Sequence, residues 1–160
     1  PPNPPLQVVL VEPKIPPNTG NIARLCAATG SILHLVEPLG FSITDASLKR
    51  AGLDYWDSVE IRFHESWEAF RKSVPPEASL SFFSTKGTRP HTAFSYRPGS
   101  YLIFGSETSG LPREILEAQP SNLIAFLPMS FQSVRSLNLA SSAAIAVYEA
   151  LRQLHAWIES

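Results

Sequence analysis

The first segment whose residue types suit a ligand site is a loop that contains two glycines. Residues 104–112 read Phe-Gly-Ser-Glu-Thr-Ser-Gly-Leu-Pro. Gly105 would let a flat ligand approach the backbone closely, and Gly110 suits a turn with positive φ before a helix begun by Pro112. Because Leu and Pro follow Gly110, the segment is neither a dinucleotide-binding fingerprint nor a P-loop. The alternative is a plain glycine turn that leaves Glu107 in solvent.

Two loops combine cationic side chains with a place for an anion. Residues 84–90 contain Lys86 and Arg89, which could meet phosphate or simply lie in solvent. Residues 12–24 read Glu-Pro-Lys-Ile-Pro-Pro-Asn-Thr-Gly-Asn-Ile-Ala-Arg. A stiff proline loop thus feeds the N-terminus of a predicted helix, which is a suitable anion site, and Arg24 lies about one turn inside that helix.

A fourth segment, residues 127–139, reads Leu-Pro-Met-Ser-Phe-Gln-Ser-Val-Arg-Ser-Leu-Asn-Leu and leads into the last predicted helix. Ser136 or Asn138 could cap that helix, which is a sufficient structural reason for either residue. Arg135 has no such structural reason. In open α/β sheets ligands bind beyond the carboxyl ends of the strands, so these loops are the best candidates for a site.

The composition indicates one compact globular domain over residues 1–160. The chain is 44% apolar and 17% charged, which is typical of a folded rather than a disordered protein. Thirteen Lys and Arg stand against fourteen Asp and Glu, so any contact with RNA must be local. The sequence contains neither an apolar run of about 18 residues nor a signal-like N-terminus, which predicts a cytoplasmic location.

The cysteine and histidine content argues against disulfides and metals. Cys26, the single cysteine, lies on the apolar stripe of a predicted helix and is interpreted as a core residue. The four histidines are scattered without i, i+4 pairing or neighbouring cysteines, so no metal site is predicted.

Short aliphatic runs alternate along the chain with segments of helical spacing. The strand candidates are residues 6–11, 32–36, 59–63, 80–84, 101–104 and 123–127. The helix candidates between them are residues 19–29, 45–51, 66–73 and 112–118. This alternation predicts an α/β domain with a mainly parallel sheet and helices on both faces.

The last helix candidate is longer than the others. Its apolar residues repeat at three- and four-residue steps over about five turns. They are Leu137, Ala140, Ala144, Val147, Leu151 and Leu154. The stripe could pack only on its own sheet, or it could also meet a second subunit.

At these motifs the sequence resembles the SPOUT superfamily, and within it the small tRNA (cytidine/uridine-34) 2′-O-methyltransferases. The resemblance covers nearly the whole chain. It has three ordered motifs: the proline loop ending at Arg24, the glycine loop from Phe104, and the segment from Leu127 to Leu139. Residues 50–55 and the Thr-Lys-Gly of residues 85–87 resemble the wobble-position branch in particular.

The resemblance implies a methyltransferase that uses S-adenosylmethionine and acts on tRNA. The cofactor is implied to lie against Phe83, Gly105, Leu127 and Ser136, with Met129 and Leu137 nearby. The resemblance also implies a C-terminal trefoil knot, although knots are rare, and a homodimer in which the first and last helices meet. One departure is visible, because Ala140 and Ser141 stand where the family usually has Ser-Asn.

Arg24 and Tyr148 are the catalytic candidates that follow from the resemblance. A ribose 2′-hydroxyl is a poor nucleophile, so the protein must supply alignment and proton management. A guanidinium is an unsuitable proton acceptor, and our hypothesis is that Arg24 binds the neighbouring phosphate and stabilises negative charge on the attacking oxygen. Tyr148 could position Arg24, stack on a base, or simply belong to the core. Lys86 and Arg135 are candidate RNA contacts.

Two other functions fit the same sequence. One is 2′-O-methylation of a different tRNA or rRNA position by the same chemistry. The other is a non-catalytic RNA-binding protein that keeps the fold, and a measurement of cofactor binding would distinguish it.

Overall fold

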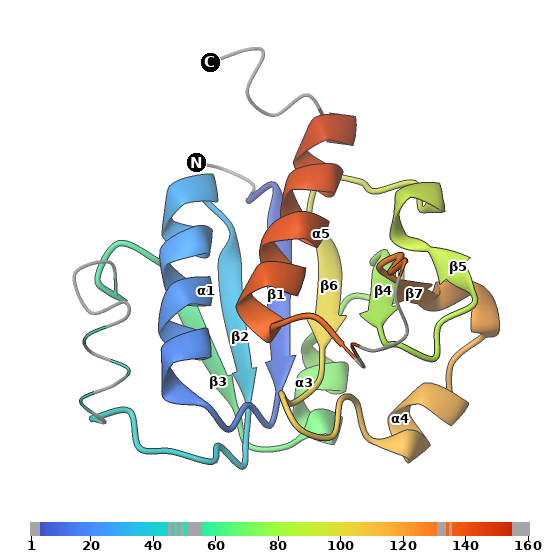
Figure 1. Ribbon diagram of the computed structural model, residues 1–160. Helices are drawn as coiled ribbons and strands as arrows, with labels where there is room; N and C mark the ends of the chain where they lie inside the picture. The colour runs from blue at the N-terminus through green and yellow to red at the C-terminus, as the bar shows by residue number, and fades with distance from the viewer. Residues whose placement is uncertain are drawn as a thin grey trace.

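The computed structural model describes residues 4–44, 46, 48, 50, 56–130, 134 and 136–154. Its strands are β1 (Leu6–Val11), β2 (Ile32–Val36), β3 (Ile61–His64), β4 (Leu80–Phe83), β5 (Arg89–Pro90), β6 (Ser100–Phe104) and β7 (Ile124–Phe126). Its α-helices are α1 (Pro16–Thr29), α3 (Trp67–Ser73), α4 (Arg113–Glu117) and α5 (Leu139–Leu154), with short 3₁₀ turns at His91–Ala93 and Ser121–Leu123. Figure 1 shows these elements arranged around one twisted sheet.

The seven strands form a single sheet in the order β3-β2-β1-β6-β4-β7-β5. Each neighbouring pair in that order is parallel. The parallel sheet predicted from the alternation of elements is therefore confirmed. Because β1, β6 and β4 are parallel neighbours, the carboxyl ends of these central strands lie at the same edge of the sheet.

Helices cover both faces of this sheet, as predicted. On one face α1 and α5 pack side by side, and Ile22, Cys26 and Val147 are buried against the central strands (Figure 1). On the other face Phe70 of α3 and Ile115 of α4 are buried in a second apolar cluster. Cys26 is fully buried, and burial raises the pKa of its thiol to about 12, so its interpretation as a core residue is confirmed.

The boundaries of α1 show how prolines begin a helix. The helix starts at Pro16, three residues before the predicted start at Thr19, because proline fits the first turn, where backbone N–H groups lack partners within the helix. Arg24 therefore lies about two turns into α1 rather than one. The helix ends at Gly30, whose φ of 70° is the left-handed conformation expected of a terminating glycine.

Three expectations about elements need adjustment. Leu137, the first member of the apolar stripe, lies before α5, which begins at Leu139. The short edge strand β5 was missed because its two residues, one of them proline, give no alternating pattern. Of the predicted helix over residues 45–51, the described residues 46, 48 and 50 are helical, and the rest lies outside the described residues. No helix in the described part of the chain is long and apolar enough to span a membrane.

Candidate active site

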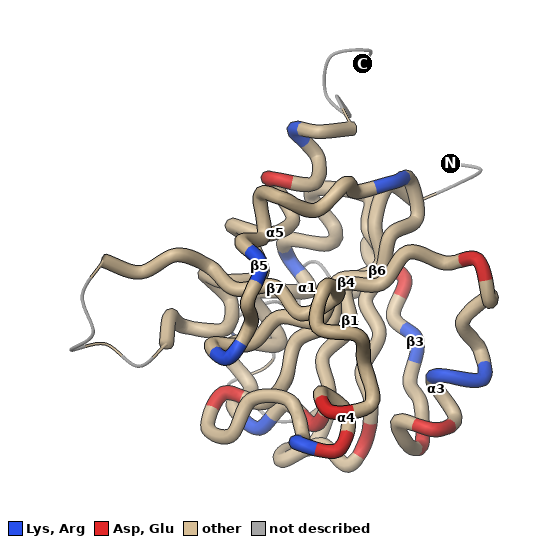
Figure 2. Tube along the Cα trace, turned by 90° about the vertical axis from the view of Figure 1, so that its right-hand side faces the viewer, with Lys and Arg blue, Asp and Glu red and all other residues tan. Residues whose placement is uncertain are grey.

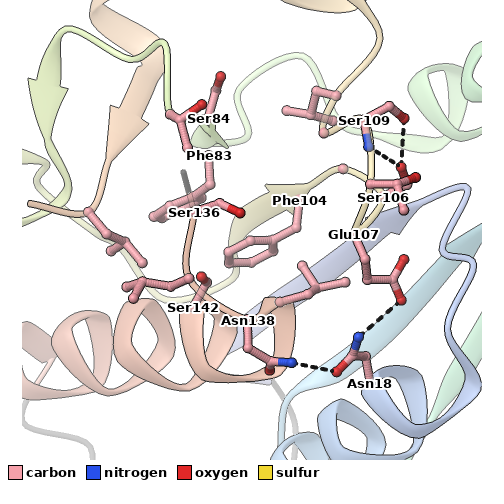
Figure 3. Close-up of a pocket in the computed structure, with 18 of the residues that line it drawn as sticks. Asn18, Phe83, Ser84, Phe104, Ser106, Glu107, Ser109, Ser136, Asn138 and Ser142 are labelled. Atoms are coloured by element: carbon pink, nitrogen blue, oxygen red, sulfur yellow. Dashed lines mark hydrogen bonds between the residues drawn. The ribbon is translucent and has the colours of Figure 1, made fainter. Parts of the chain in front are cut away.

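A cavity of about 540 Å³ lies where β4, β6 and β7 end and α5 begins. Phe83 ends β4, Phe104 ends β6 and Leu127 directly follows β7, and all three line the cavity. Figure 3 shows side chains from these loops converging on one space. The position matches the expectation that ligands bind beyond the carboxyl ends of parallel strands, and the volume suits a small organic ligand.

The six residues predicted to hold a cofactor all line this cavity. They are Phe83, Gly105, Leu127, Met129, Ser136 and Leu137. They come from three loops that are far apart in the sequence. The structure therefore brings together the set that the resemblance implied, and their role in binding is taken up below.

Aromatic rings form part of the cavity wall. The rings of Phe83 and Phe104 stack with their centroids 4.6 Å apart and their planes 15° from parallel. Beside them, Leu127 and Leu139 add aliphatic surface. An apolar wall of this kind with serine and asparagine side chains around it suits a ligand that has a flat ring and a polar end.

The glycine loop after β6 closes tightly on itself. Ser106 and Gly110 exchange two backbone hydrogen bonds, and the Ser106 side chain accepts from the backbone N–H of Ser109. Gly110 has the predicted positive φ, 69°. A Cβ at Gly105 would lie 2.0 Å from the backbone of Gly110 and Leu111. Gly105 is thus required by the loop itself, which corrects the expectation that its missing side chain serves the close approach of a flat ligand.

Glu107 in this loop caps the distant start of α1. Its carboxylate accepts hydrogen bonds of 2.8 Å from the backbone N–H groups of both Lys14 and Ile15. Pro16 and Pro17, the next two residues, have no N–H, and the helix has no acidic side chain in its own first turn. The alternative of a solvated Glu107 is therefore wrong, and the anion at this helix N-terminus is a carboxylate of the protein.

Two asparagines extend this contact to α5. Asn18 Nδ2 donates to Glu107 at 3.3 Å, and Asn18 Oδ1 accepts from Asn138 Nδ2 at 3.1 Å (Figure 3). Asn138 Oδ1 in turn accepts from the backbone N–H of Ser141, so Asn138 is the helix cap that the sequence left open. We call Glu107, Asn18 and Asn138 the polar relay. It joins all three motifs, and the motif spacing alone did not single out its members.

Arg24 and Tyr148 lie outside the cavity wall. Arg24 is exposed on α1, six residues after Asn18 and hence about 9 Å farther along the helix axis. Tyr148 is half exposed on the neighbouring helix α5, so the alternative of a core tyrosine is wrong. The two catalytic candidates thus lie on adjacent helices, at some distance from the cavity within this chain.

The cationic residues considered for RNA or phosphate contact lie in different surroundings. Lys86 is exposed and lines the cavity. Arg89 donates to the backbone carbonyls of Asn122 and Ala93, and its guanidinium lies 4.6 Å from the centre of the Phe94 ring. It therefore holds a turn together. Arg135 lies outside the described residues.

The cavity offers few groups that could exchange a proton. Among its described lining residues, only Glu107 and Lys86 carry acidic or basic side chains. Both oxygens of Glu107 already accept hydrogen bonds. Within the described part of the chain, no three His, Cys, Asp or Glu side chains gather in a way that could hold a metal ion. Acidic and basic residues are interspersed along the described chain (Figure 2).

Comparison with known proteins identifies relatives of the whole fold. The sequence model of the SpoU rRNA methylase family matches residues 5–148. The chain is 50% identical to a tRNA (cytidine(34)-2′-O)-methyltransferase of Escherichia coli strain K12, over 93% of this chain and 94% of that protein. It is 52% identical to the enzyme of the same name from Saccharophagus degradans, over 92% and 94% of the two chains.

Solved structures agree with these sequence matches. One, described as structural insights into the 2-OH methylation of C/U34 on tRNA, superposes with a TM-score of 0.89 at 47% identity and covers 94% of this chain and 96% of its own. The SpoU methyltransferase AviRb from Streptomyces viridochromogenes, in complex with the cofactor AdoMet, superposes with a TM-score of 0.81 at 24% identity. That match covers 96% of this chain and 62% of AviRb, and it supports the fold alone.

Proposed function

The chain belongs to the SpoU rRNA methylase family, and from that premise we propose that it methylates the ribose 2′-hydroxyl of the wobble nucleotide of tRNA, position 34. The observation that carries the proposal is the meeting of three motifs at one cavity. It is supported by about half identity, over nine tenths of the chain, to tRNA (cytidine(34)-2′-O)-methyltransferases.

S-adenosylmethionine is the proposed cofactor, and when bound it supplies an activated methyl group. The six lining residues predicted from the resemblance would hold it. The stacked Phe83 and Phe104 rings and Leu127 fit its adenine ring, and Gly105 lies in the wall of the same cavity. Ser136 and the amides of the polar relay offer polar contacts for its amino-acid end.

Arg24 is proposed to act on the RNA side of the reaction. Its guanidinium carries a permanent charge and can pair with a phosphate through two hydrogen bonds. It would hold the phosphate beside the wobble ribose and stabilise negative charge as the 2′-oxygen attacks. Because both oxygens of Glu107 already accept hydrogen bonds, the proton is proposed to leave to phosphate or water.

Three further residues are proposed to contact or orient the RNA. Tyr148, half exposed on α5, would position Arg24 or stack on a base. Lys86 lies at the cavity where it could meet a phosphate, and Arg135 is proposed for the same purpose from its motif alone.

A homodimer is proposed as the active form. Ile145 and Tyr148 are 44% and 50% exposed on α5, and Arg24 is exposed on the neighbouring helix α1, so these two helices together present apolar surface and a cation. Because Arg24 lies about two turns from the cavity of its own chain, it would serve the cavity of a second copy. Light scattering at micromolar concentration should give a dimeric mass, and a monomeric mass would reject the shared site.

A C-terminal trefoil knot, a single methyltransferase domain and a cytoplasmic location are also proposed. The trefoil knot would arise where the chain from β7 to α5 passes the loops around β4 and β6. It is supported by the match of residues 5–148 to the SpoU rRNA methylase family and by the resemblance of the motifs to knotted relatives. The chain would act as one methyltransferase domain, in the cytoplasm where tRNA is found.

The decisive experiment is a tritiated-methyl assay on tRNA that lacks the modification, followed by nucleoside mapping. The parent protein should place the methyl group on the ribose at position 34. A product at another tRNA position or on rRNA would favour a different substrate, a methyl group on a base would reject the chemistry, and cofactor binding without transfer to any RNA would favour a non-catalytic role.

Arg24→Ala tests the mechanism within that assay. The variant should bind S-adenosylhomocysteine nearly as well as the parent but transfer methyl groups roughly a hundredfold more slowly, because the lost charge acts mainly in the transition state. Arg24→Lys should recover only part of the rate, because an ammonium cannot pair with phosphate in the same planar way. Near-parental transfer by the alanine variant would remove Arg24 from the mechanism.

A further inference from the structure

The loop between β1 and α1 is fastened to two other loops. The chain turns at Glu12, whose φ of 53° is a left-handed conformation that residues with a side chain seldom adopt. The carbonyl of Pro13 then accepts a hydrogen bond of 2.9 Å from the backbone N–H of Gly40. The backbone N–H of Lys14 donates one of 2.8 Å to the carboxylate of Glu107. The backbone of Lys14 is therefore fixed between the loop after β2 and the loop after β6.

Gly40 also fixes the start of the Lys14 side chain. A Cβ at Gly40 would lie 2.9 Å from the Cα of Lys14 and 3.0 Å from its Cβ and Cγ. The side chain of Lys14 can begin there only because residue 40 has none. Lys14 is nevertheless exposed, and its ammonium group takes part in none of the ion pairs among the described residues. The loop thus presents a cation that has a fixed backbone and that a ligand can reach.

This cation lies at the rim of the cavity. Ile15, the residue after Lys14, is 40% exposed and lines the cavity wall. Lys86 lines the same cavity from the loop after β4. Figure 3 shows Ser84 of that loop and Glu107, which holds the Lys14 backbone, on opposite sides of the cavity. A polynucleotide strand with one ribose at the cavity would therefore have a lysine on either side.

We propose that Lys14 binds a backbone phosphate of the tRNA strand at the cavity, and that Gly40 is the positioning residue that fixes Lys14. The inference rests on the proposed function, because that function brings an RNA strand to this cavity. Phosphate contacts fix the register of a nucleic acid without reading its sequence, and an ammonium is a compact charge for such a contact. The whole chain has a net charge of −1, so attraction to RNA must come from local cations of this kind.

Lys14→Gln removes the charge and keeps most of the side chain. It should weaken tRNA binding by roughly fivefold and lower the slope of log affinity against log salt concentration by about 0.7, the share of one phosphate contact on a single strand. Lys14→Arg keeps the charge and should stay within about twofold of the parent. Lys72→Gln is the matched control, because it removes an exposed cation from α3, on the opposite face of the sheet from α1, and it should change neither quantity.

Kinetics and calorimetry identify the anion that Lys14 meets. For an RNA phosphate, the KM for tRNA should rise about fivefold in Lys14→Gln while kcat stays within about twofold, because the contact is the same before and during methyl transfer. The affinity for S-adenosylhomocysteine should also stay within about twofold of the parent. The cofactor's carboxylate is the other anion at this cavity. A fall in the affinity for S-adenosylhomocysteine at parental tRNA affinity would assign Lys14 to the cofactor and overturn the proposal.

A double-mutant cycle tests the positioning role of Gly40. Gly40→Ala should displace the Lys14 side chain and weaken tRNA binding by roughly two- to fivefold. If this effect passes through Lys14, Gly40→Ala should cause no further loss in a protein that already carries Lys14→Gln. An equal loss in both backgrounds would reject the positioning role of Gly40. Thermal unfolding of each variant identifies those that are folded.

A folded Lys14→Gln variant whose tRNA affinity and salt slope both match the parent would overturn the proposal. Filter binding of tRNA over a series of salt concentrations measures both quantities without any methyl transfer. A parent protein that binds tRNA but places no methyl group at position 34 would count against the proposed function alone. In that case the salt slope of tRNA binding still decides the role of Lys14.

Discussion

Two polar clusters among the described residues differ in their surroundings, because the polar relay borders the 540 Å³ cavity and the other cluster does not line it. The polar relay is built from loops at the carboxyl ends of strands and leaves amide hydrogens available to a ligand. The other cluster joins Gln7, His34 and His64 on β1, β2 and β3. His34 is 2% exposed and packs against the rings of Phe70 on α3 and Tyr101 on β6.

The histidine cluster uses its hydrogen bonds internally. His34 Nε2 lies 2.6 Å from Gln7 Oε1, so this nitrogen is the donor, and Nδ1 accepts from His64 Nε2 at 2.9 Å. Both ring nitrogens of His34 are satisfied, and none of the three residues lines the cavity. The comparison shows that a cluster of buried polar side chains indicates a ligand-binding site only where some of its hydrogen-bond donors lack a protein acceptor and face a cavity.

The largest effect on ligand binding and stability should come from replacing Gly105 in the cavity loop by a residue with a side chain. Gly105→Val places a side chain where even a Cβ would lie 2.0 Å from the backbone of Gly110 and Leu111, so the loop must open. We expect loss of S-adenosylhomocysteine binding and destabilisation by about 3 kcal/mol or more. Calorimetry and denaturant unfolding measure the two effects, and a variant of parental stability and affinity would show that the loop closes differently.

The histidine cluster should make the protein sensitive to acid. Burial, together with the charges of His64 and Arg62, lowers the pKa of His34 to about 3, and burial also lowers the pKa of His64. The unfolded chain then binds more protons than the folded protein between about pH 6.5 and pH 3. The free energy of unfolding should therefore fall on acidification through this window, by up to about 1.4 kcal/mol per pH unit for His34.

His34→Gln checks the origin of that slope. The variant should show a flatter dependence of the free energy of unfolding on pH, measured by urea unfolding between pH 4 and 7. Its affinity for S-adenosylhomocysteine at pH 7.5 should match the parent, because the cluster does not touch the cavity. An unchanged slope would assign the acid sensitivity to other groups.

Glu107→Gln should have a smaller effect on stability that extends to the ligand. Glutamine replaces one acceptor oxygen with an amide nitrogen, which would face a backbone N–H of Lys14 or Ile15. We expect destabilisation by about 1–2 kcal/mol together with weaker ligand binding, because α1 and Asn18 lose their anchor. Glu77→Gln, at an exposed loop position, is the control and should change neither quantity.

The smallest effect is expected at the exposed ion pair on α4. Arg113 donates to Glu117 one turn later, and both side chains are mostly exposed. Arg113→Ala should change the free energy of unfolding by no more than about 0.5 kcal/mol. A larger change in either stability or ligand affinity would mean that α4 is coupled to the preceding cavity loop.

The sequence predicted the strands and helices of this fold better than it predicted the contacts between residues that are distant in the chain. The regular spacing of apolar residues predicted β1, β2 and the ends of most helices, because such periodicity reflects local secondary structure. The six cavity residues were identified through the family resemblance. The contact between Glu107 and the start of α1 spans more than ninety residues, and no local pattern reports it.

The histidine pair was missed for the same reason. His34 and His64 were judged scattered, yet parallel pairing of β2 with β3 brings them within hydrogen-bond distance. The sequence contained one usable signal, since each histidine lies in or next to a predicted strand of similar length. Only the strand order and register, however, decide which side chains become neighbours.

The position of β6 in the sheet determines when the sheet can form while the chain is being synthesised on the ribosome. The strands β3, β2 and β1 form one block and β4, β7 and β5 another, and β6 alone is bonded to both. A chain made from its N-terminus must therefore reach residue 100 before β1 gains its second neighbour. Until residue 107 emerges, the first helix also lacks its carboxylate cap. The residues that join the two half-sheets thus also contribute to the cavity, so a nascent chain cannot acquire its ligand site before its two half-sheets become one.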